Sequence, residues 1–307
     1  MKKTLLRVGT RGSKLALAQT DWVITQLKKY YPQLEIEKII IKTTGDKILN
    51  APLSKIGGKG LFVKEIEEAL LRGEIDFAVH SMKDVPSQVP NGLEISIIPE
   101  RESPFDVWIS NFESLERLPD FSKVGTSSLR RFSQIKRLRK DLVIEPLRGN
   151  VDTRLRKWRE GWYEGIVLAE AGIKRLGIEI KYRRFSLEEM IPAVGQGALG
   201  IELREEDEEV KGVLKVIHSE KTALAVRAER AFLKTMEGGC QVPLGAYAFF
   251  QNGDLVITGF ISDLEGERFY KHSVKGPPLE AEKLGVNLAQ ELLKRGGKEI
   301  LEELYGE

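Results

Sequence analysis

The sequence predicts an α/β protein with two similar α/β domains joined by hinge segments, followed by a smaller C-terminal α+β domain that holds a three-stranded antiparallel sheet. A strand, a turn and a helix follow one another twice, and the triplet Val-Gly-Thr stands at both turns, at residues 8–10 and 124–126. Strand and helix patterns alternate through most of the chain, which is typical of a mostly parallel sheet. Only the last third changes to consecutive strands.

The first domain begins with an apolar strand over residues 4–9 and a turn that ends at Ser13, which stands where a helix N-cap is expected. The apolar face of the following helix is formed by Leu15, Ala18, Trp22 and Leu27. The other elements expected in this domain are strands over 36–42, 75–80 and 93–98 and a helix over 63–72.

The second domain repeats this order. Its first strand ends at Thr126, Ser127 and Ser128 offer helix caps, and residues 129–140 predict a basic helix. Two further strands, over 143–146 and 165–169, flank a helix near 153–160.

Two segments predict crossings between these domains. Pro99 and Pro104 surround the charged residues 100–102, and residues 191–195 read Ile-Pro-Ala-Val-Gly. Because the chain would pass between the domains twice, we expect these segments to form a hinge.

The C-terminal domain has a different pattern. A helix over 221–236 precedes two strands, over 246–251 and 254–261, and Asn252-Gly253 between them is the pair that most favours a type I′ hairpin turn. A third strand is expected over 269–274 and a helix over 279–294. The expected domains are residues 1–98 with 193–217, residues 103–190, and residues 219–307.

Composition and charge exclude several classes of protein. No apolar run approaches the roughly 20 residues of a membrane span, and basic residues interrupt the N-terminus where a signal peptide would be apolar, so we expect a cytoplasmic protein without a membrane partner. One cysteine, Cys240, and 3 histidines predict neither a disulfide nor a metal site. The 48 Lys and Arg against 46 Asp and Glu give a net charge of +2, which argues against nucleic-acid binding.

Positive charge is concentrated in residues 123–160, which contain 12 Lys or Arg against 4 Asp or Glu. Arg130 and Arg131 follow the second strand-to-helix turn, and Arg148 and Arg154 follow the next strand. Arginines at the ends of successive parallel strands converge on one crevice, where α/β sheets usually bind ligands. The alternative, a solvated helix face, fits the basic residues further along the same helix better: Lys136, Arg137, Arg139 and Lys140.

The first strand-to-helix turn carries similar chemistry. Arg11 and Ser13 lie beside the N–H groups of a helix start, and this combination suits an anion. Taken alone, such a turn is more often explained by ordinary capping.

Two glycine-rich segments were compared with phosphate-binding motifs. Lys55 and Lys59 lie among glycines but lack the Ser or Thr that follows the lysine of a P-loop. They fit either a mobile cationic lid or a flexible surface loop. Residues 195–200 match GxGxxG, but residues 201–203 alternate like a strand where the dinucleotide fingerprint requires a helix, so a dinucleotide site is rejected.

Two further positions are chemical candidates. Lys83 and Asp84 follow a buried strand, where Asp84 would stay ionised beside cationic groups and could stabilise a cation or accept hydrogen bonds from a ring N–H. The alternative is a salt-bridged pair that shapes a turn. Cys240 follows the end of a helix, in a loop without an evident histidine partner, and is either a small apolar filler or a reactive thiol.

Taken together, these residues resemble the porphobilinogen deaminase family, also called hydroxymethylbilane synthases. The resemblance runs in order through most of the chain and has no departure at a motif position. Its motifs are Gly9-Thr10-Arg11-Gly12-Ser13, Gly57-Gly58-Lys59-Gly60-Leu61-Phe62, His80-Ser81-Met82-Lys83-Asp84, Val124-Gly125-Thr126-Ser127-Ser128-Leu129-Arg130-Arg131, Leu147-Arg148-Gly149-Asn150, Lys174-Arg175-Leu176-Gly177, Ala193-Val194-Gly195-Gln196-Gly197 and Glu237-Gly238-Gly239-Cys240-Gln241-Val242-Pro243.

The resemblance implies two periplasmic-binding-protein-like domains and a transferase of porphyrin, tetrapyrrole and heme biosynthesis. Such an enzyme joins four porphobilinogen units head to tail on a dipyrromethane cofactor, held by a thioether to Cys240, and releases ammonia and hydroxymethylbilane. Asp84, with Lys83, is implied as catalytic, Phe62 as a ring contact beside the lid lysines Lys55 and Lys59, and we expect a monomer. The residues implied to bind cofactor and substrate carboxylates are Arg11, Ser13, Thr126, Ser127, Ser128, Arg130, Arg131, Arg148, Arg154 and Arg175.

Two other functions remain open from the sequence. A non-catalytic two-domain binding protein for anionic solutes would share the hinge and the arginines, but it would not need a modified thiol on Cys240. A nucleic-acid binder would use the basic segment, but no nucleic-acid motif accompanies it.

Overall fold

The computed structural model describes residues 4–47, 63–86, 88–236 and 242–305. It divides into two compact units, the first formed by Met1–Glu102 with Gly197–Ala223 and the second by Ser103–Gln196 with Leu224–Glu307. The chain leaves the first unit after Glu102, inside the first predicted crossing, and leaves the second unit after Gln196, one residue beyond the second predicted crossing.

Unit 1 is built on a five-stranded sheet in the order β2-β1-β3-β10-β4. Its strands are β1 (Leu5–Thr10), β2 (Glu35–Ile40), β3 (Phe77–Ser81), β4 (Leu93–Ile97) and β10 (Leu199–Arg204). β1 is parallel to β2 and β3, whereas β10 is antiparallel to β3 and β4. The described helices are α1 (Lys14–Tyr30), α2 (Thr44–Lys47), α4 (Lys64–Leu71), α8 (Glu208–Leu214) and the 3₁₀ turns η1 (Met82–Asp84) and η3 (Lys215–Ile217).

Unit 2 contains a second five-stranded sheet, in the order β7-β6-β8-β5-β9. Its strands are β5 (Asp106–Ser110), β6 (Lys123–Gly125), β7 (Val143–Glu145), β8 (Gly165–Ala169) and β9 (Arg183–Arg184). β6 is parallel to β7 and β8, and β5 is antiparallel to β8 and β9. The helices around this sheet are α5 (Leu129–Leu138), α6 (Val151–Arg159), α7 (Glu170–Arg175) and the 3₁₀ turn η2 (Leu115–Arg117).

The two sheets have the same topology. Among the parallel strands of each sheet, the one that comes first in the chain, β1 or β6, lies second in the strand order. The single antiparallel strand, β10 or β5, lies fourth. β5 and β10, the antiparallel strands, are the first strands after the two crossings. The predicted pair of similar α/β domains is confirmed, and the strand at Leu199–Arg204 confirms that GxGxxG does not open a helix here.

The C-terminal part of unit 2 is the predicted α+β structure. The strands β11 (Leu244–Gln251), β12 (Asp254–Ser262) and β13 (Phe269–Gly276) form an antiparallel sheet in that order. Asn252 and Gly253 have φ of 53° and 88°, the positive values that the predicted type I′ turn requires. The helices are α9 (Glu220–Thr235), α10 (Ala281–Leu292) and α11 (Lys298–Tyr305), with η5 (Leu293–Gly297) between the last two.

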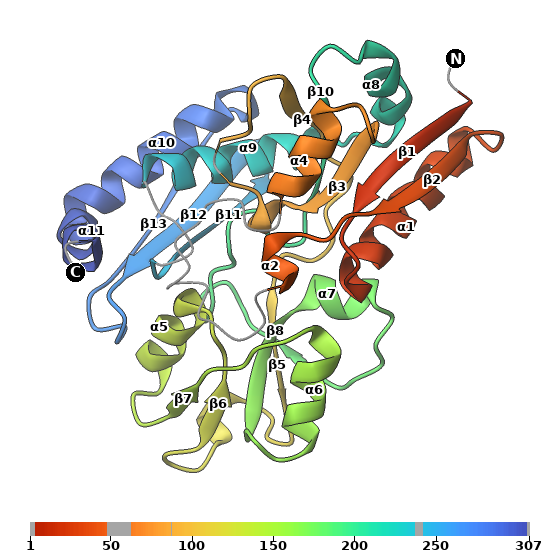
Figure 1. The fold of residues 1–307 in the computed structure, drawn as a ribbon. Helices are drawn as coiled ribbons and strands as arrows, with labels where there is room; N and C mark the ends of the chain where they lie inside the picture. The colour runs from red at the N-terminus through yellow and green to blue at the C-terminus, as the bar shows by residue number, and fades with distance from the viewer. Residues whose placement is uncertain (1–3, 48–62, 87, 237–241, 306–307) are drawn as a thin grey trace. The chain divides into compact units, whose positions relative to one another are not determined.

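Apolar packing joins these helices to the C-terminal sheet. Phe232 of α9 and Leu288 of α10 are fully buried in one cluster with Ile257 of β12. Figure 1 shows α10 lying along this sheet, in agreement with its contacts to β12 and β13. The sheet is therefore covered by helices, as an α+β layer requires.

The predicted apolar face of α1 is confirmed at Leu27 and at Trp22, which packs against the same core cluster. Leu27 is buried as expected, but Leu15, Ala18 and Trp22 are only partly buried. Gln19, Thr20 and Val23 are buried instead. The Thr20 hydroxyl donates to Thr10 Oγ1 at 2.9 Å, so a polar residue of the helix contacts the end of β1.

Candidate functional site

In unit 1, two predicted site segments lie at one edge of the sheet. β1, β2 and β3 are parallel, so their carboxyl ends share an edge. The turn after β1 carries Arg11 and Ser13, and the turn after β3 carries Lys83 and Asp84. Ser13 is the N-cap of α1, and its Oγ accepts a hydrogen bond from the N–H of Ala16 at 3.2 Å.

Arg11 is paired with a carboxylate that the sequence analysis did not single out. Its Nε donates to Asp46 Oδ1 at 3.1 Å, and Thr43 Oγ1 donates to Asp46 Oδ2 at 2.8 Å. Burial by itself would raise the pKa of Asp46, but the hydrogen bonds from Arg11 and Thr43 lower it below its usual value. The side chains of Arg11 and Asp46 are 24% and 26% exposed, so solvent reaches this ion pair.

Lys83 and Asp84 are exposed on η1, at the end of a rigid strand. The N–H of Met82 donates to Ala198 O at 3.0 Å, which fixes the start of this turn to the residue before β10. The roles of Lys83 and Asp84 stay predictions.

A cluster of ionisable side chains adjoins β3, the strand that leads to this turn. His80 Nε2 and Glu202 Oε2 are 2.8 Å apart, and both side chains are buried. Glu67 on α4 completes the cluster: burial and the nearby charge of Glu202 raise its pKa to about 7, although His80 acts in the opposite direction. The sequence analysis did not identify this cluster, because its members lie on three separate elements.

In unit 2, the parallel strands β6, β7 and β8 bring a second set of predicted residues to one sheet edge. Thr126, Ser127 and Ser128 follow β6, Arg148 follows β7, and α7 with Arg175 at its end follows β8. The residues that directly follow β6 and β7 therefore lie at a common edge of the sheet, whereas Arg175 is the last residue of α7.

The three hydroxyl residues after β6 shape the turn itself. The N–H of Ser128 donates to Thr126 Oγ1 at 3.2 Å, and Ser127 Oγ donates to Leu147 O at 3.1 Å. Ser128 is the N-cap of α5 and accepts from the N–H of Arg131. The Ser127 hydrogen bond therefore connects the turn after β6 to the segment after β7.

Arg154 lies on the first turn of α6, close to the Arg148 loop. Its Nε donates to Gly149 O at 2.8 Å. Gly149 has φ of 104°, a left-handed value that other residues rarely adopt, and a Cβ there would meet Thr153 at 2.8 Å. The loop that carries Arg148 and accepts the hydrogen bond from Arg154 therefore requires a glycine at this position.

Arg130 and Arg131 are buried and share one counter-ion, Asp106, the first residue of β5. Arg130 donates from Nη1 to Asp106 Oδ2 at 2.8 Å and from Nη2 to Oδ1 at 3.1 Å. Arg131 donates to Oδ1 from Nε at 3.0 Å and from Nη2 at 2.7 Å. Sequence analysis missed Asp106 together with β5, although the apolar run 107–109 was the available signal.

The electrostatics of this cluster favour a further anion. Burial would raise the pKa of Asp106, but Arg130 and Arg131 lower it to about 2, so the carboxylate is ionised at neutral pH. Burial lowers the pKa of Arg131, and the charge of Arg130 acts in the same direction. Two guanidiniums against one carboxylate leave a formal charge of 2 − 1 = +1 in a buried position.

The remaining arginines and lysines of α5 are more exposed, as expected from the sequence. Arg137 packs over the ring of Phe269 at 4.5 Å, Arg139 pairs with Asp141, and Lys140 pairs with Glu267. The contacts of these side chains lie on the surface of unit 2 and not at the sheet edge.

A second buried carboxylate, Glu170, lies at the start of α7. It accepts hydrogen bonds from Arg184 Nε at 2.7 Å, from the Tyr182 hydroxyl at 3.0 Å and from Ser103 Oγ. Burial would raise the pKa of Glu170, but these hydrogen bonds lower it below its usual value. The hydrogen bond from Ser103 thereby connects the first crossing to α7, the helix that ends at Arg175.

Four predicted residues lie outside the described residues: the attachment residue Cys240, the lid lysines Lys55 and Lys59, and Phe62. Among the residues that are described, no group of three or more His, Cys, Asp or Glu is placed to hold a metal ion. No described helix is long and apolar enough to cross a membrane.

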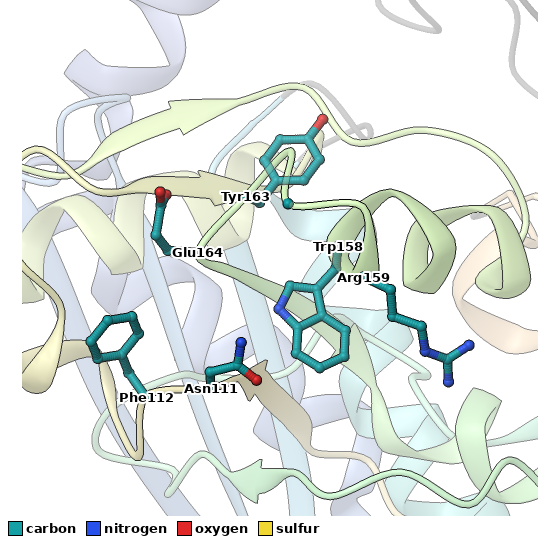
Figure 2. A pocket seen from close by; sticks show the side chains of 7 residues that line it. Asn111, Phe112, Trp158, Arg159, Tyr163 and Glu164 are labelled. Atoms are coloured by element: carbon teal, nitrogen blue, oxygen red, sulfur yellow. The ribbon is translucent and has the colours of Figure 1, made fainter.

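A cavity of about 380 Å³ in unit 2 lies away from these residues. Figure 2 shows it bordered by Trp158 and Arg159 at the end of α6, by Asn111 and Phe112, and by residues just before β8. These are the amino ends of β6 and β8, whereas the arginines and hydroxyls follow the carboxyl ends. The cavity is therefore not part of the candidate site.

Family models and curated relatives match almost the whole chain. A model described as porphobilinogen deaminase, dipyromethane cofactor binding domain, matches residues 6–212, and one described as porphobilinogen deaminase, C-terminal domain, matches residues 223–294. The porphobilinogen deaminase of Geobacter sulfurreducens is 51% identical over 301 residues, which are 98% of this chain and 95% of the relative. That of Syntrophobacter fumaroxidans is 48% identical over 307 residues, 99% of each chain.

Among solved structures, the periplasmic aliphatic sulphonate binding protein of Escherichia coli aligns with a TM-score of 0.40 and 16% identity over 77% of this chain and 71% of its own. The two family models and the curated relatives agree along the chain. The chain belongs to the porphobilinogen deaminase family, whose cofactor is dipyrromethane.

Proposed function

We propose that this chain deaminates porphobilinogen and joins four units head to tail on a dipyrromethane held by a thioether at Cys240, releasing ammonia and hydroxymethylbilane. Each porphobilinogen carries an acetate and a propionate, so a growing chain of pyrroles accumulates carboxylates. The single observation that carries the proposal is the unit 2 sheet edge, where Thr126–Ser128 and several arginines adjoin a buried cluster with a formal charge of +1.

The residues of the chain fit a pyrrole cofactor with carboxylate side chains. Arg forks bind carboxylates through two parallel N–H···O bonds, and Ser and Thr hydroxyls add single donors. The residues that we propose to hold cofactor and substrate carboxylates are Arg11, Ser13, Thr126, Ser127, Ser128, Arg130, Arg131, Arg148, Arg154 and Arg175. When bound, the dipyrromethane supplies the nucleophilic pyrrole carbon to which the first unit is joined.

Asp84 is the proposed catalytic residue. Loss of ammonia from porphobilinogen leaves a cation, and a preorganised carboxylate stabilises positive charge as it develops. The same carboxylate can accept a hydrogen bond from the pyrrole N–H of the substrate and so orient the ring. Lys83, next in the turn, is proposed to bind a substrate carboxylate, and Lys55, Lys59 and Phe62 to cover the reacting ring.

Further parts of the proposal concern organisation and setting. We propose three domains, residues 1–98 with 193–217, residues 103–190, and residues 219–307 with the cofactor cysteine. The enzyme acts as a cytoplasmic monomer in heme biosynthesis, without nucleic-acid or membrane partners. The near-neutral net charge of +2 supports the absence of a nucleic-acid partner.

The function is tested by incubating the purified protein with porphobilinogen and measuring ammonia and linear tetrapyrrole by mass spectrometry. We expect the wild-type protein to release four ammonia molecules for each tetrapyrrole, and Cys240→Ala to form no tetrapyrrole because it cannot hold the primer. Binding of porphobilinogen without ammonia release by either protein would support the alternative, a non-catalytic binding protein for anionic solutes.

A further inference from the structure

We propose that Asp106 is a positioning residue for carboxylate binding: it fixes the guanidiniums of Arg130 and Arg131 side by side at the unit 2 sheet edge, so that a substrate carboxylate meets a preorganised pair. This inference rests on the proposed function. Asp106 itself would touch neither cofactor nor substrate, because its side chain is fully buried behind both arginines.

The position of each guanidinium is set by more than one contact. Besides its two bonds to Asp106, Arg130 donates from Nη1 to Ile191 O at 2.7 Å. Arg131 donates from Nη1 to Val167 O at 2.9 Å, in the middle of β8. Contacts from two elements therefore fix each planar group in distance and in orientation.

The carboxylate of Asp106 is held in turn. It is the first residue of β5, and Gln196 Nε2 donates to its Oδ1 at 3.2 Å and to Pro104 O at 2.6 Å. The segment after the first crossing and the end of the second crossing thus meet at this carboxylate. A displacement of Asp106 would move both arginines together.

Donors remain for a ligand. A guanidinium has five N–H groups, and Arg130 and Arg131 each use three in these contacts, which leaves 5 − 3 = 2 on each within the described part of the chain. Both arginines follow the Ser128 cap, at the edge that carries Thr126, Ser127 and Arg148. A carboxylate with two oxygens matches a pair of preorganised donors in number and in charge.

One carboxylate for two arginines also sets the charge. Without Asp106, two buried guanidiniums would repel one another and turn apart. With a second carboxylate, the cluster would be neutral and would have no excess charge for an anion. Asp106 is ionised at neutral pH, since the two arginines lower its pKa to about 2.

The test compares Asp106→Asn with Glu189→Gln in primer-carrying protein. Glu189 also binds one arginine through two bonds, from Arg183 Nη1 at 3.2 Å and Nη2 at 2.6 Å, and its pKa is also lowered to about 2, but it contacts none of the proposed site residues. The measurement is the steady-state KM for porphobilinogen and kcat for ammonia release.

We expect Asp106→Asn to raise KM at least about tenfold while kcat changes less than about threefold, because lost carboxylate binding weakens ground state and transition state alike. Glu189→Gln should leave both constants within about twofold of wild type. An Asp106→Asn protein that folds and keeps the wild-type KM would overturn the inference, as would a KM that rises equally in Glu189→Gln. If wild-type protein released no ammonia, the proposed function would fail instead.

A second variant keeps the inference testable if Asp106→Asn does not fold. Asp106→Glu retains the charge but moves the carboxylate by one methylene, which displaces both guanidiniums. We expect KM to rise at least about threefold with little change in kcat, because misplacement of a binding group by about 1 Å already weakens its interactions. An unchanged KM in folded Asp106→Glu would contradict a positioning role.

Discussion

The two sheet edges share a topology but treat their arginines differently. In unit 1, Arg11 pairs with Asp46, and both side chains are about one quarter exposed. In unit 2, Arg130 and Arg131 share Asp106, and the three side chains are 7%, 8% and 0% exposed. The same strand, turn and helix thus carry a partly exposed ion pair in one unit and a buried cluster with excess positive charge in the other.

This difference indicates a division of work between the edges. Salt and water screen an exposed pair, whereas a buried positive cluster keeps its attraction for a carboxylate. Under the proposed function, we therefore expect unit 2 to bind the carboxylates of the pyrrole chain. Unit 1 carries the exposed Lys83 and Asp84 on a turn fixed to β10, which suits chemistry on one ring.

The largest expected effect concerns the stability of the two counter-ions. Asp106→Asn should lower the free energy of unfolding by about 3–5 kcal/mol, because it leaves two buried guanidiniums without a counter-charge. Asp46→Asn should lower it by about 1 kcal/mol or less, because solvent screens that pair. Urea unfolding of both variants measures the difference, and equal losses would contradict the contrast between the edges.

The next effect separates chemistry from binding. Asp84→Asn in unit 1 should lower kcat about 10²- to 10³-fold with a small change in KM, as loss of a preorganised electrostatic group does elsewhere. Arg148→Gln in unit 2 should mainly raise KM. Both effects are measured by steady-state kinetics, on protein that mass spectrometry has shown to carry its primer. A near-wild-type kcat for Asp84→Asn would contradict a catalytic role for Asp84.

The pH dependence of stability should have opposite signs in the two units. The pKa of Asp106 is about 2, below its usual 3.8, so Asp106 stabilises the folded state above pH 3.8. This stabilisation, about 2 kcal/mol, is lost as the pH falls toward 2. The pKa of Glu67, about 7, lies above its usual 4.5, so stability is lost as the pH rises from 4.5 to 7. Because Glu67 is partly exposed, we expect the free energy of unfolding to fall by only about 1 kcal/mol as Glu67 ionises.

The pH dependence predicted for unit 1 is checked by measuring the free energy of unfolding of wild type and Glu67→Gln between pH 4.5 and pH 7. The glutamine cannot ionise, so its stability should not fall between about pH 5 and pH 7 by as much as that of wild type. Parallel curves for the two proteins would show that Glu67 has an ordinary pKa.

The smallest effect concerns the equivalent helix caps. Ser13→Ala and Ser128→Ala should each cost about 1 kcal/mol, because each serine accepts a hydrogen bond from an N–H of the first helical turn. Thermal unfolding of the two variants measures the loss. A much larger loss for one cap would show that its turn has a further structural role.

The sequence predicted the elements that local patterns determine. Ser13 and Ser128 are the N-caps of their helices, and Asn252-Gly253 forms the hairpin turn, because capping and turn chemistry act within a few residues. The alternation of strands and helices likewise predicted two similar sheets. These features depend on neighbours along the chain, which a pattern can show.

The counter-ions could not be predicted in this way. Asp46 lies 35 residues from Arg11, and Asp106 lies 24 residues from Arg130 and 25 from Arg131. Charge patterns along the chain do not reveal which carboxylate a fold brings to an arginine. The sequence separated Arg130 and Arg131 from the rest of the basic helix, but only the antiparallel strand β5, which the pattern analysis missed, explains why they are buried.

The measurement that tests the central claim most directly is the intact mass of the purified protein beside Cys240→Ala, with peptide mapping of any adduct. A chain whose arginines bind pyrrole carboxylates for an attached primer should show a mass excess of two condensed porphobilinogen units on Cys240, and the variant should show none. A wild-type thiol that stays unmodified after incubation with porphobilinogen, without release of ammonia, would contradict the account.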